Sequence, residues 1–270
     1  MPETSNRILP GRRLIRFPGG PGAVLDRGSP GGMPPLVLLH GFGGDALSWQ
    51  YNIQALVKGG RRVLAVDLPG HGASTLDIPS GLGGGADWVD RLLEALDLPV
   101  VDVIGHSMGG RISLLLAERH PQRVRRMSLI ASAGLGNRVD AGFLRALCDM
   151  ETMDQARALI DRLFAGAPPN RDTLARAFLA RLANAAARAP LIRLLDRLVA
   201  DIDAAPPRFD WTQALPPLQL IWGLADDIVP PPDPGSIPER IPLHRLAGVG
   251  HMPQAQAATQ VNALLTEFHT

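Results

Sequence analysis

The sequence predicts an α/β protein in which a mostly parallel sheet is flanked by helices and interrupted by a helical insertion. Three observations support this fold class. In the first half of the chain, short apolar runs alternate with stretches whose apolar residues recur every three or four positions. This pattern stops at residue 135 and resumes after residue 206. The length of 270 residues is compatible with one large core.

The first half of the chain is expected to supply the buried parallel strands. Each predicted strand is a short apolar run followed by a turn, and these runs are residues 36–40, 63–66, 100–104 and 127–130. Helices with one apolar face are expected between them, at residues 47–57, 88–96 and 111–119. Residues 14–17 and 23–25 are expected to form an antiparallel hairpin at the sheet edge.

Residues 135–206 are expected to form a cap of about four helices over a pocket. The segment is rich in Ala, Leu, Arg and Asp and has no strand pattern. The expected breaks between its helices are at Gly166, Pro168, Pro169 and Pro190. One helical face needs a packing partner because it is lined by apolar side chains, namely Leu191, Leu194, Leu195, Leu198 and Ile202.

The cap divides the core into residues 1–134 and residues 207–270. The second part of the core is expected to add two further strands, at residues 218–222 and 243–246. An amphipathic helix at residues 255–268 is expected to follow them. The chain is therefore predicted to form one core with one insertion.

Composition and charge exclude several classes of function. The chain has 27 basic and 26 acidic side chains, so it lacks the positive excess that nucleic-acid binding requires. No uncharged apolar stretch approaches the length of a membrane span. Cys148 is the only cysteine, which rules out an intramolecular disulfide and a zinc site built from cysteines. We expect a cytoplasmic protein that uses no metal and no cofactor.

Ser107 is the predicted nucleophile. It is the central residue of the Gly-x-Ser-x-Gly pattern at residues 105–109, which lies between a strand-like run and a helix-like run. In this context a sharp strand-to-helix turn exposes the serine hydroxyl, and glycines avoid steric collisions around it. A glycine-rich turn with a solvated serine is the alternative interpretation.

The predicted base and acid follow the nucleophile in the order typical of this turn. A serine hydroxyl needs a base, usually a histidine that a carboxylate orients. His251 suits the role of base because it lies in a glycine-rich loop after the last predicted strand. Asp226 suits the role of acid because it leaves the strand that ends near Trp222, although the neighbouring Asp227 is an alternative.

Two backbone amides are expected to stabilise the negative charge that develops on the substrate oxygen. Met108 would donate one from the start of the helix, and Phe42 the other from the loop that follows a strand. Candidate residues of the substrate pocket are His40, His71, Phe143 and Phe164, of which His71 is alternatively a turn residue.

These landmarks resemble the α/β-hydrolase superfamily. They are the loop 40–44, the segment Asp67 to Gly72, the turn around Ser107, Trp222 to Asp226, and the pair Gly250 and His251. Residues 128–136 and 250–254 are further similar to the hydrolase-like region of the acyltransferase subunit of acetoin dehydrogenase complexes. The resemblance implies an eight-stranded sheet and a helical cap after its sixth strand. It assigns the roles of nucleophile, acid and base to the residues argued above.

The predicted function is that of a serine hydrolase acting on an ester, thioester or related acyl compound, with a small molecule as substrate. One alternative is an acyltransferase that passes the acyl group to a thiol, either coenzyme A or a dihydrolipoyl group. The resemblance then implies association with a 2-oxo acid dehydrogenase-type complex. Lys58, the only lysine, ends a helix-like segment, so we expect no lipoyl domain here and a carrier supplied by another chain. A carbon–carbon bond hydrolase and a ligand-binding protein without activity are further alternatives. The oligomeric state stays open.

Overall fold

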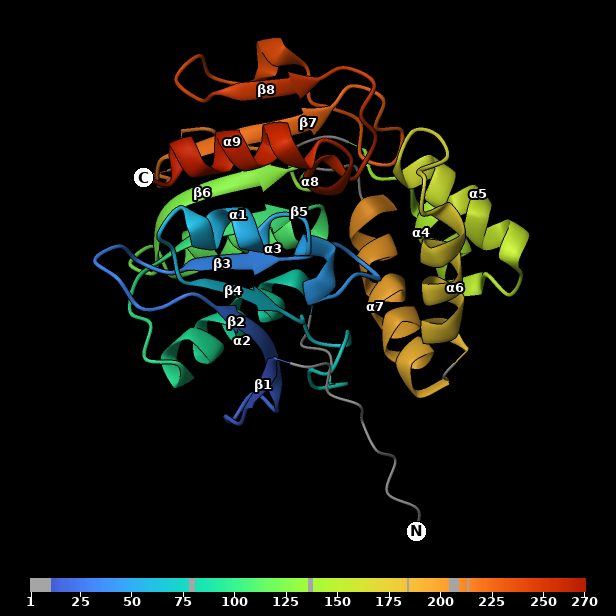
Figure 1. The fold of residues 1–270 in the computed structure, drawn as a ribbon, viewed down its shortest axis with the longest axis horizontal. Helices are drawn as coiled ribbons and strands as arrows, with labels where there is room; N and C mark the ends of the chain where they lie inside the picture. The colour runs from blue at the N-terminus through green and yellow to red at the C-terminus, as the bar shows by residue number, and fades with distance from the viewer. Residues whose placement is uncertain (1–10, 78–80, 136–137, 184, 204–208, 213) are drawn as a thin grey trace.

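The computed structural model of the chain describes residues 11–77, 81–135, 138–183, 185–203, 209–212 and 214–270. These residues contain an eight-stranded sheet with the order β1-β2-β4-β3-β5-β6-β7-β8 (Figure 1). The strands from β4 to β8 in this order are parallel, whereas β2 is antiparallel to both β1 and β4. The strands are β1 (Arg12–Ile15), β2 (Gly22–Arg27), β3 (Leu36–Leu39), β4 (Val63–Val66), β5 (Val101–His106), β6 (Val124–Ile130), β7 (Leu218–Gly223) and β8 (Leu243–Leu246). The predicted α/β fold class is confirmed.

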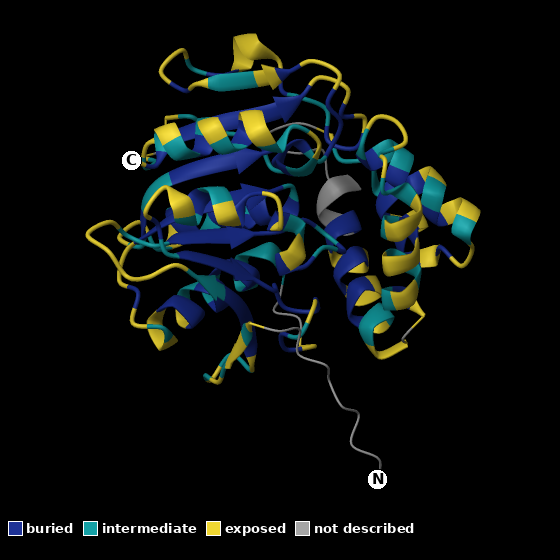
Figure 2. Ribbon diagram, in the orientation of Figure 1, coloured by how far each residue is buried: buried dark blue, intermediate teal, exposed yellow. Residues whose placement is uncertain are grey.

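Helices cover both faces of the sheet, because its central strands are apolar on both sides. Along β3, Leu36 and Leu38 face one apolar cluster, and Val37 and Leu39 face the other. The first cluster includes residues of η1 (Ala46–Trp49), α1 (Ile53–Lys58) and α9 (Ala258–Phe268). The second includes residues of α2 (Gly81–Ala95) and α3 (Met108–Arg119). Figure 2 shows the central strands buried between helices whose outer faces are exposed.

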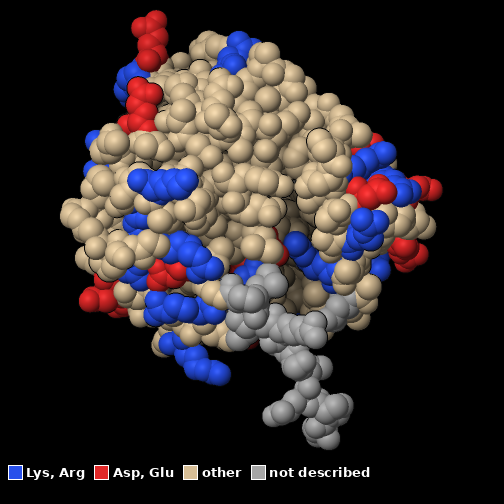
Figure 3. Space-filling view, in the orientation of Figure 1, with Lys and Arg blue, Asp and Glu red and all other residues tan. Residues whose placement is uncertain are grey.

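Four helices stand between β6 and β7 in the sequence and lie beside the carboxyl ends of the strands (Figure 1). They are α4 (Ala141–Asp149), α5 (Met153–Leu163), α6 (Arg171–Leu182) and α7 (Ala185–Asp203). We call this segment the helical insertion. Its outer surface carries charges of both signs, as Figure 3 shows over α5 and α6. There Arg157 lies 2.9 Å from both Asp154 and Asp172.

Pro190 does not separate two helices, as the sequence predicts, but lies inside α7. A proline inside a helix costs about 3 kcal/mol, because it lacks the N–H donor and crowds the preceding turn. Burying a leucine side chain contributes about 1.5–3 kcal/mol. Four leucines of α7 are buried, so their packing offsets the penalty; they are Leu191, Leu194, Leu195 and Leu198. The face that they form contacts the core cluster next to α2 and α3, as well as α4 and α6.

Two predicted helices are each divided into two shorter ones. The stretch at 47–57 forms the 3-10 helix η1 and then α1, and the side chain of Asp45 caps the start of η1. The stretch at 255–268 forms α8 (Pro253–Gln256) and α9, which meet at Ala257. A short 3-10 helix, η2 (Pro234–Ser236), precedes β8. Within the described residues, no helix combines the length and apolar character needed to span a bilayer.

Candidate active site

Ser107 occupies the turn between β5 and α3, at the carboxyl edge of the sheet. Its backbone has φ of +53° and ψ of −115°, a conformation that residues with side chains rarely adopt. The neighbouring glycines make the turn possible. A Cβ atom on Gly109 would collide with the backbone of Leu39, and one on Gly105 would collide with the backbone of Gly109. The turn therefore presents the Ser107 hydroxyl at the edge of the sheet and keeps it close to β3.

Ser107, His251 and Asp226 form a hydrogen-bonded series. The Oγ of Ser107 is 3.0 Å from Nε2 of His251, and Nδ1 of His251 is 2.7 Å from Oδ2 of Asp226. A carboxylate can only accept, so Nδ1 carries the hydrogen and the lone pair of Nε2 faces Ser107. His251 and Asp226 are buried, whereas Ser107 is partly exposed. Such an arrangement can move the serine proton onto the imidazole.

The structure distinguishes between the two adjacent acids. The Oδ1 atom of Asp226 accepts hydrogen bonds from the backbone N–H groups of Ile228 (3.0 Å) and Val229 (2.9 Å), which aims Oδ2 at His251. The carboxylate of Asp227 points to the surface instead and lies 3.2 Å from Arg162. The geometry thus agrees with the choice of Asp226.

Two side chains hold the loop that carries His251. The ring of His106 donates a hydrogen bond from Nε2 to the backbone oxygen of His251, at 2.7 Å. Burial and the neighbouring His251 keep the pKa of His106 well below its usual value, so the ring is neutral. Gln256 accepts from the N–H of Gly250 and donates to the oxygen of Gly248. Sequence reasoning missed Gln256, because a glutamine in an amphipathic helix carries no local signal of such a contact.

The loop at residues 41–44 passes beside the nucleophile. A Cβ atom on Gly41 would lie 3.1 Å from Cβ of Ser107 and 2.8 Å from Nδ1 of His106. Within the described part of the chain, the backbone N–H groups of Phe42 and Met108 donate to no other protein group. Both N–H groups are therefore free to donate, and their role toward a substrate oxygen stays a prediction.

His40 and His71 support this loop by hydrogen bonds and do not line the cavity, so neither lies where a substrate-pocket candidate should, and His71 fits its interpretation as a turn residue. His71 accepts a hydrogen bond from the N–H of Gly43 at Nε2, and His40 accepts one from the N–H of Leu68. Their other ring nitrogens donate to the backbone oxygens of Pro69 and Gly41. Burial, followed by the neighbouring His40, lowers the pKa of His71 to about 3. Burial likewise lowers the pKa of His40. The correction has a physical reason: both rings satisfy backbone groups that no strand or helix satisfies.

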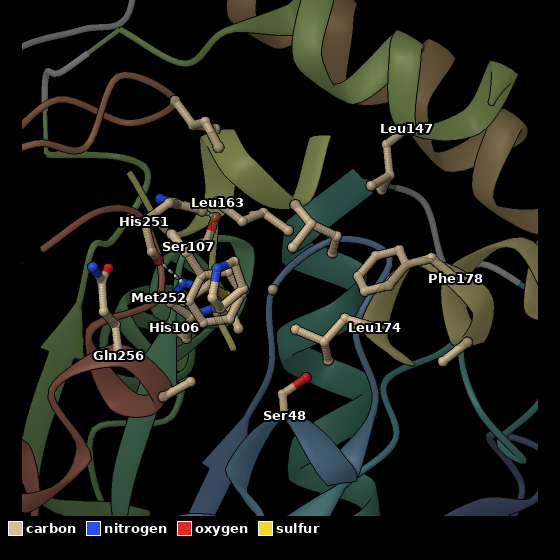
Figure 4. A pocket seen from close by; sticks show the side chains of 18 of the residues that line it. Ser48, His106, Ser107, Leu147, Leu163, Leu174, Phe178, His251, Met252 and Gln256 are labelled. Carbon is tan, nitrogen blue, oxygen red and sulfur yellow. Dashed lines mark hydrogen bonds between the residues drawn. The ribbon is translucent and has the colours of Figure 1, made fainter. Parts of the chain in front are cut away.

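A cavity of about 740 Å³ opens above Ser107, between the core and the helical insertion (Figure 4). Its size lies within the range of roughly 300–1,000 Å³ that is typical of small-molecule sites. Most of the lining is apolar and comes from α4, α5 and α6 and the segment after α5, including Phe143, Leu147, Leu163, Phe164, Leu174 and Phe178. Phe143 and Phe164 are thus among the lining residues, and their contact with substrate stays a prediction. Arg181, at the end of α6, also reaches this cavity, which no sequence signal indicated.

A second series of a serine, a histidine and an aspartate, with contacts of the same kind, lies inside the core. The Oγ of Ser128 is 2.8 Å from Nε2 of His269, whose Nδ1 is 3.3 Å from Oδ2 of Asp102. All three residues are buried, and none lines the cavity. Asp102 is held by Arg61 and Arg125. This network ties His269, which follows α9, to β5 and β6.

The family model described as the alpha/beta hydrolase fold matches residues 34–258. The acetyltransferase component of the acetoin cleaving system of Pseudomonas putida, named as acting on a dihydrolipoyllysine residue, is 37% identical over 262 residues. That alignment covers 96% of this chain and 67% of the relative. The component of the same name from Cupriavidus necator is 28% identical, and the chain spans 63% of its length. The similarity predicted from short motifs is confirmed.

Other relatives and solved structures carry the names of further hydrolases. The 2-hydroxy-6-oxononadienedioate/2-hydroxy-6-oxononatrienedioate hydrolase of Cupriavidus pinatubonensis is 29% identical, with 88% of this chain and 87% of the relative covered. Among solved structures, the meta-cleavage product hydrolase of Pseudomonas fluorescens IP01 is 26% identical. It superposes with a TM-score of 0.80 over 95% of this chain and 96% of its own.

Proposed function

Because the chain belongs to the α/β hydrolase family, we propose that it is a serine hydrolase which cleaves an ester, thioester or related acyl bond. The observation that carries this proposal is the hydrogen-bonded series from Ser107 through His251 to Asp226 at the floor of an apolar cavity. In this proposal Ser107 is the nucleophile, His251 the general base and Asp226 the group that orients it.

The first half of the reaction forms an acyl-enzyme. Nε2 of His251 takes the proton of Ser107 while Oγ attacks the acyl carbon. Asp226 keeps the hydrogen on Nδ1 and stabilises the imidazolium that results. The imidazolium then gives its proton to the leaving alcohol or thiol, and the bond to the leaving group breaks. The acyl group remains on Ser107.

The negative oxygen formed during this attack needs donors that are already in place. The N–H groups of Phe42 and Met108 would supply them, and losing one such donor typically costs about 3 kcal/mol of transition-state stabilisation. His71 supports this role indirectly, because its bond to the N–H of Gly43 holds the residue next to Phe42. The helical insertion acts as a cap in this proposal, because it supplies most of the apolar side of the cavity.

In the second half of the reaction, His251 activates the acceptor. Water would release the free acid and regenerate Ser107. A thiol in place of water would make the protein an acyltransferase, which is the second candidate. The relatives named as acetyltransferase components of acetoin cleaving systems favour it. A dihydrolipoyl group would then be the acyl acceptor.

The first test is covalent labelling with a fluorophosphonate probe, which reacts with activated serines. Ser107→Ala should abolish labelling. Ser128→Ala is the matched control, because Ser128 also hydrogen-bonds to a histidine, His269, but is buried and does not line the cavity. Loss of labelling in Ser128→Ala but not in Ser107→Ala would refute the proposed nucleophile. Turnover of p-nitrophenyl esters and acyl thioesters, with and without added thiols, then separates hydrolysis from acyl transfer.

A further inference from the structure

We infer that the acyl group accepted by this site is uncharged and apolar, and that Asp45 and Arg181 exclude acyl groups ending in a carboxylate. This inference rests on the proposed function and names its substrate class. Arg181, from α6 of the helical insertion, and Asp45, from the loop beside the nucleophile, both line the cavity. They are the permanently charged side chains among the described residues that do so.

The two charged side chains form an ion pair with each other. The guanidinium of Arg181 lies 3.2 Å from the carboxylate of Asp45 and also donates to the backbone oxygen of Gly43. It stacks over the ring of Phe178, 5.5 Å from its centroid. Burial opposes ionisation of Asp45, but Arg181 and Arg12 outweigh it and hold the pKa of this carboxyl below its usual value. The charge of Arg181 is therefore already neutralised by Asp45, so Arg181 is not available as a counter-ion for a substrate carboxylate.

The pairing of positive and negative side chains continues beneath the cavity lining. Arg12 lies 3.6 Å from Asp45 and 3.3 Å from the buried Asp67. Two arginines thus face two aspartates, and the cluster as a whole is neutral. A substrate carboxylate that entered the cavity would lose its hydration and would meet Asp45 before it met an unpaired cation. Burying a charge without a partner is strongly unfavourable.

The positions of the side chains indicate which part of the substrate enters the apolar region. In Figure 4, His251 and Gln256 lie on one side of Ser107, whereas Leu174 and Phe178 lie on the other. The leaving group must receive its proton from Nε2 of His251, so it occupies the side of His251. The acyl group is left with the apolar side, between the core and α6.

This inference separates the chain from relatives whose names describe dioate substrates, which carry a second carboxylate. The difference would arise in the cap, where the paired Arg181 cannot act as a counter-ion.

The test compares three p-nitrophenyl esters of nearly equal length: the octanoate, the hydrogen suberate and the methyl suberate. At about pH 7.5 the terminal carboxyl group of the hydrogen suberate is ionised. We expect kcat/KM for this ester to be at least about 100-fold below that for the methyl suberate, because its charge is buried without a partner. The neutral methyl suberate controls for size and for the polar end.

Three variants test the residues. Asp45→Asn retains a helix-capping side chain but removes the negative charge that pairs with Arg181. It should reduce the ratio of kcat/KM between the methyl suberate and the hydrogen suberate, called the gap below, at least tenfold. Arg181→Gln removes the cation and should leave the gap as wide or wider. Asp227→Asn makes the same chemical change on an exposed acid outside the cavity and should leave the gap unchanged.

The outcomes separate the inference from the proposed function. A gap of less than tenfold in the unmodified protein would overturn the inference, and so would an unchanged gap in Asp45→Asn. A protein that hydrolyses none of the three esters and takes up no fluorophosphonate would instead refute the proposed serine hydrolase.

Discussion

The substitution Asp226→Asn tests the proposed mechanism most directly, because the structure dictates how the asparagine side chain must orient. Two backbone N–H groups, those of Ile228 and Val229, donate to Oδ1. The amide oxygen of asparagine must take this position, since the reverse orientation leaves two buried donors without acceptors. Each unsatisfied donor costs about 1–3 kcal/mol, so the reverse orientation lies at least about 2 kcal/mol higher.

The amide NH₂ group then faces Nδ1 of His251, which must present a lone pair. The ring hydrogen moves to Nε2, next to Ser107, and His251 can no longer accept the serine proton. Turnover should fall by about 10⁴-fold, equivalent to about 5.4 kcal/mol of transition-state stabilisation. Folding should be little affected, because shape and the bonds to Oδ1 are retained.

The assay is hydrolysis of a p-nitrophenyl ester, with thermal unfolding as a check on folding. Asp227→Asn is the matched control, since Asp227 makes only a surface ion pair with Arg162. Exposed pairs of this kind contribute about 0–1 kcal/mol to stability. More than about a tenth of the activity remaining in Asp226→Asn, or a greater loss in Asp227→Asn, would refute the proposed role of Asp226.

Two further predictions concern the cap and the support of the oxyanion loop. We expect two cap variants, Phe164→Ala and Phe143→Leu, to alter the ranking of kcat/KM across esters of increasing chain length. The milder change is made at Phe143 because this residue is buried. A small fluorophosphonate should still label Ser107 at an unchanged rate. An unaltered ranking in both variants would remove these residues from the pocket. His71 has its folded-state pKa lowered to about 3, so below the unfolded pKa of about 6.5 the unfolded chain binds more protons, and stability falls as pH falls. In urea titrations, His71→Gln should lessen this dependence by about 1.4 kcal/mol per pH unit between these two values, and an equal slope in both proteins would contradict a neutral, buried His71.

Several features of the fold followed from local patterns. The apolar runs of β3, β4 and β7 are short and bounded by turns, and the structure places strands at these residues. Helix boundaries were less accurate, because capping and packing determine them. The stretch at 47–57 was predicted as one helix, yet it divides at residues 50–52 into η1 and α1. Pro190 was predicted as a break because burial of the leucines around it is invisible in one dimension.

The candidate site shows the same division. The order of Ser107, Asp226 and His251, each just after a strand pattern, predicts that they lie at one sheet edge, because parallel strands end at the same edge. The position of Asp226 after Trp222 also favoured it over Asp227. The catalytic roles remain predictions, although the structure brings the three side chains together.

The sequence by itself determined where the candidate functional residues lie along the chain. It indicated which turn holds the serine, which loop holds the histidine, and where the insertion interrupts the sheet. Those features are local, since a turn needs glycine and a buried strand needs apolar residues within a few positions. Only the tertiary structure decided that His40 and His71 bind backbone groups under the loop, and that Arg181 meets Asp45 across 136 positions of sequence. A side chain that can satisfy either a substrate or a buried backbone group looks the same in the sequence. Its role depends on which partner the folded chain brings within about 3 Å.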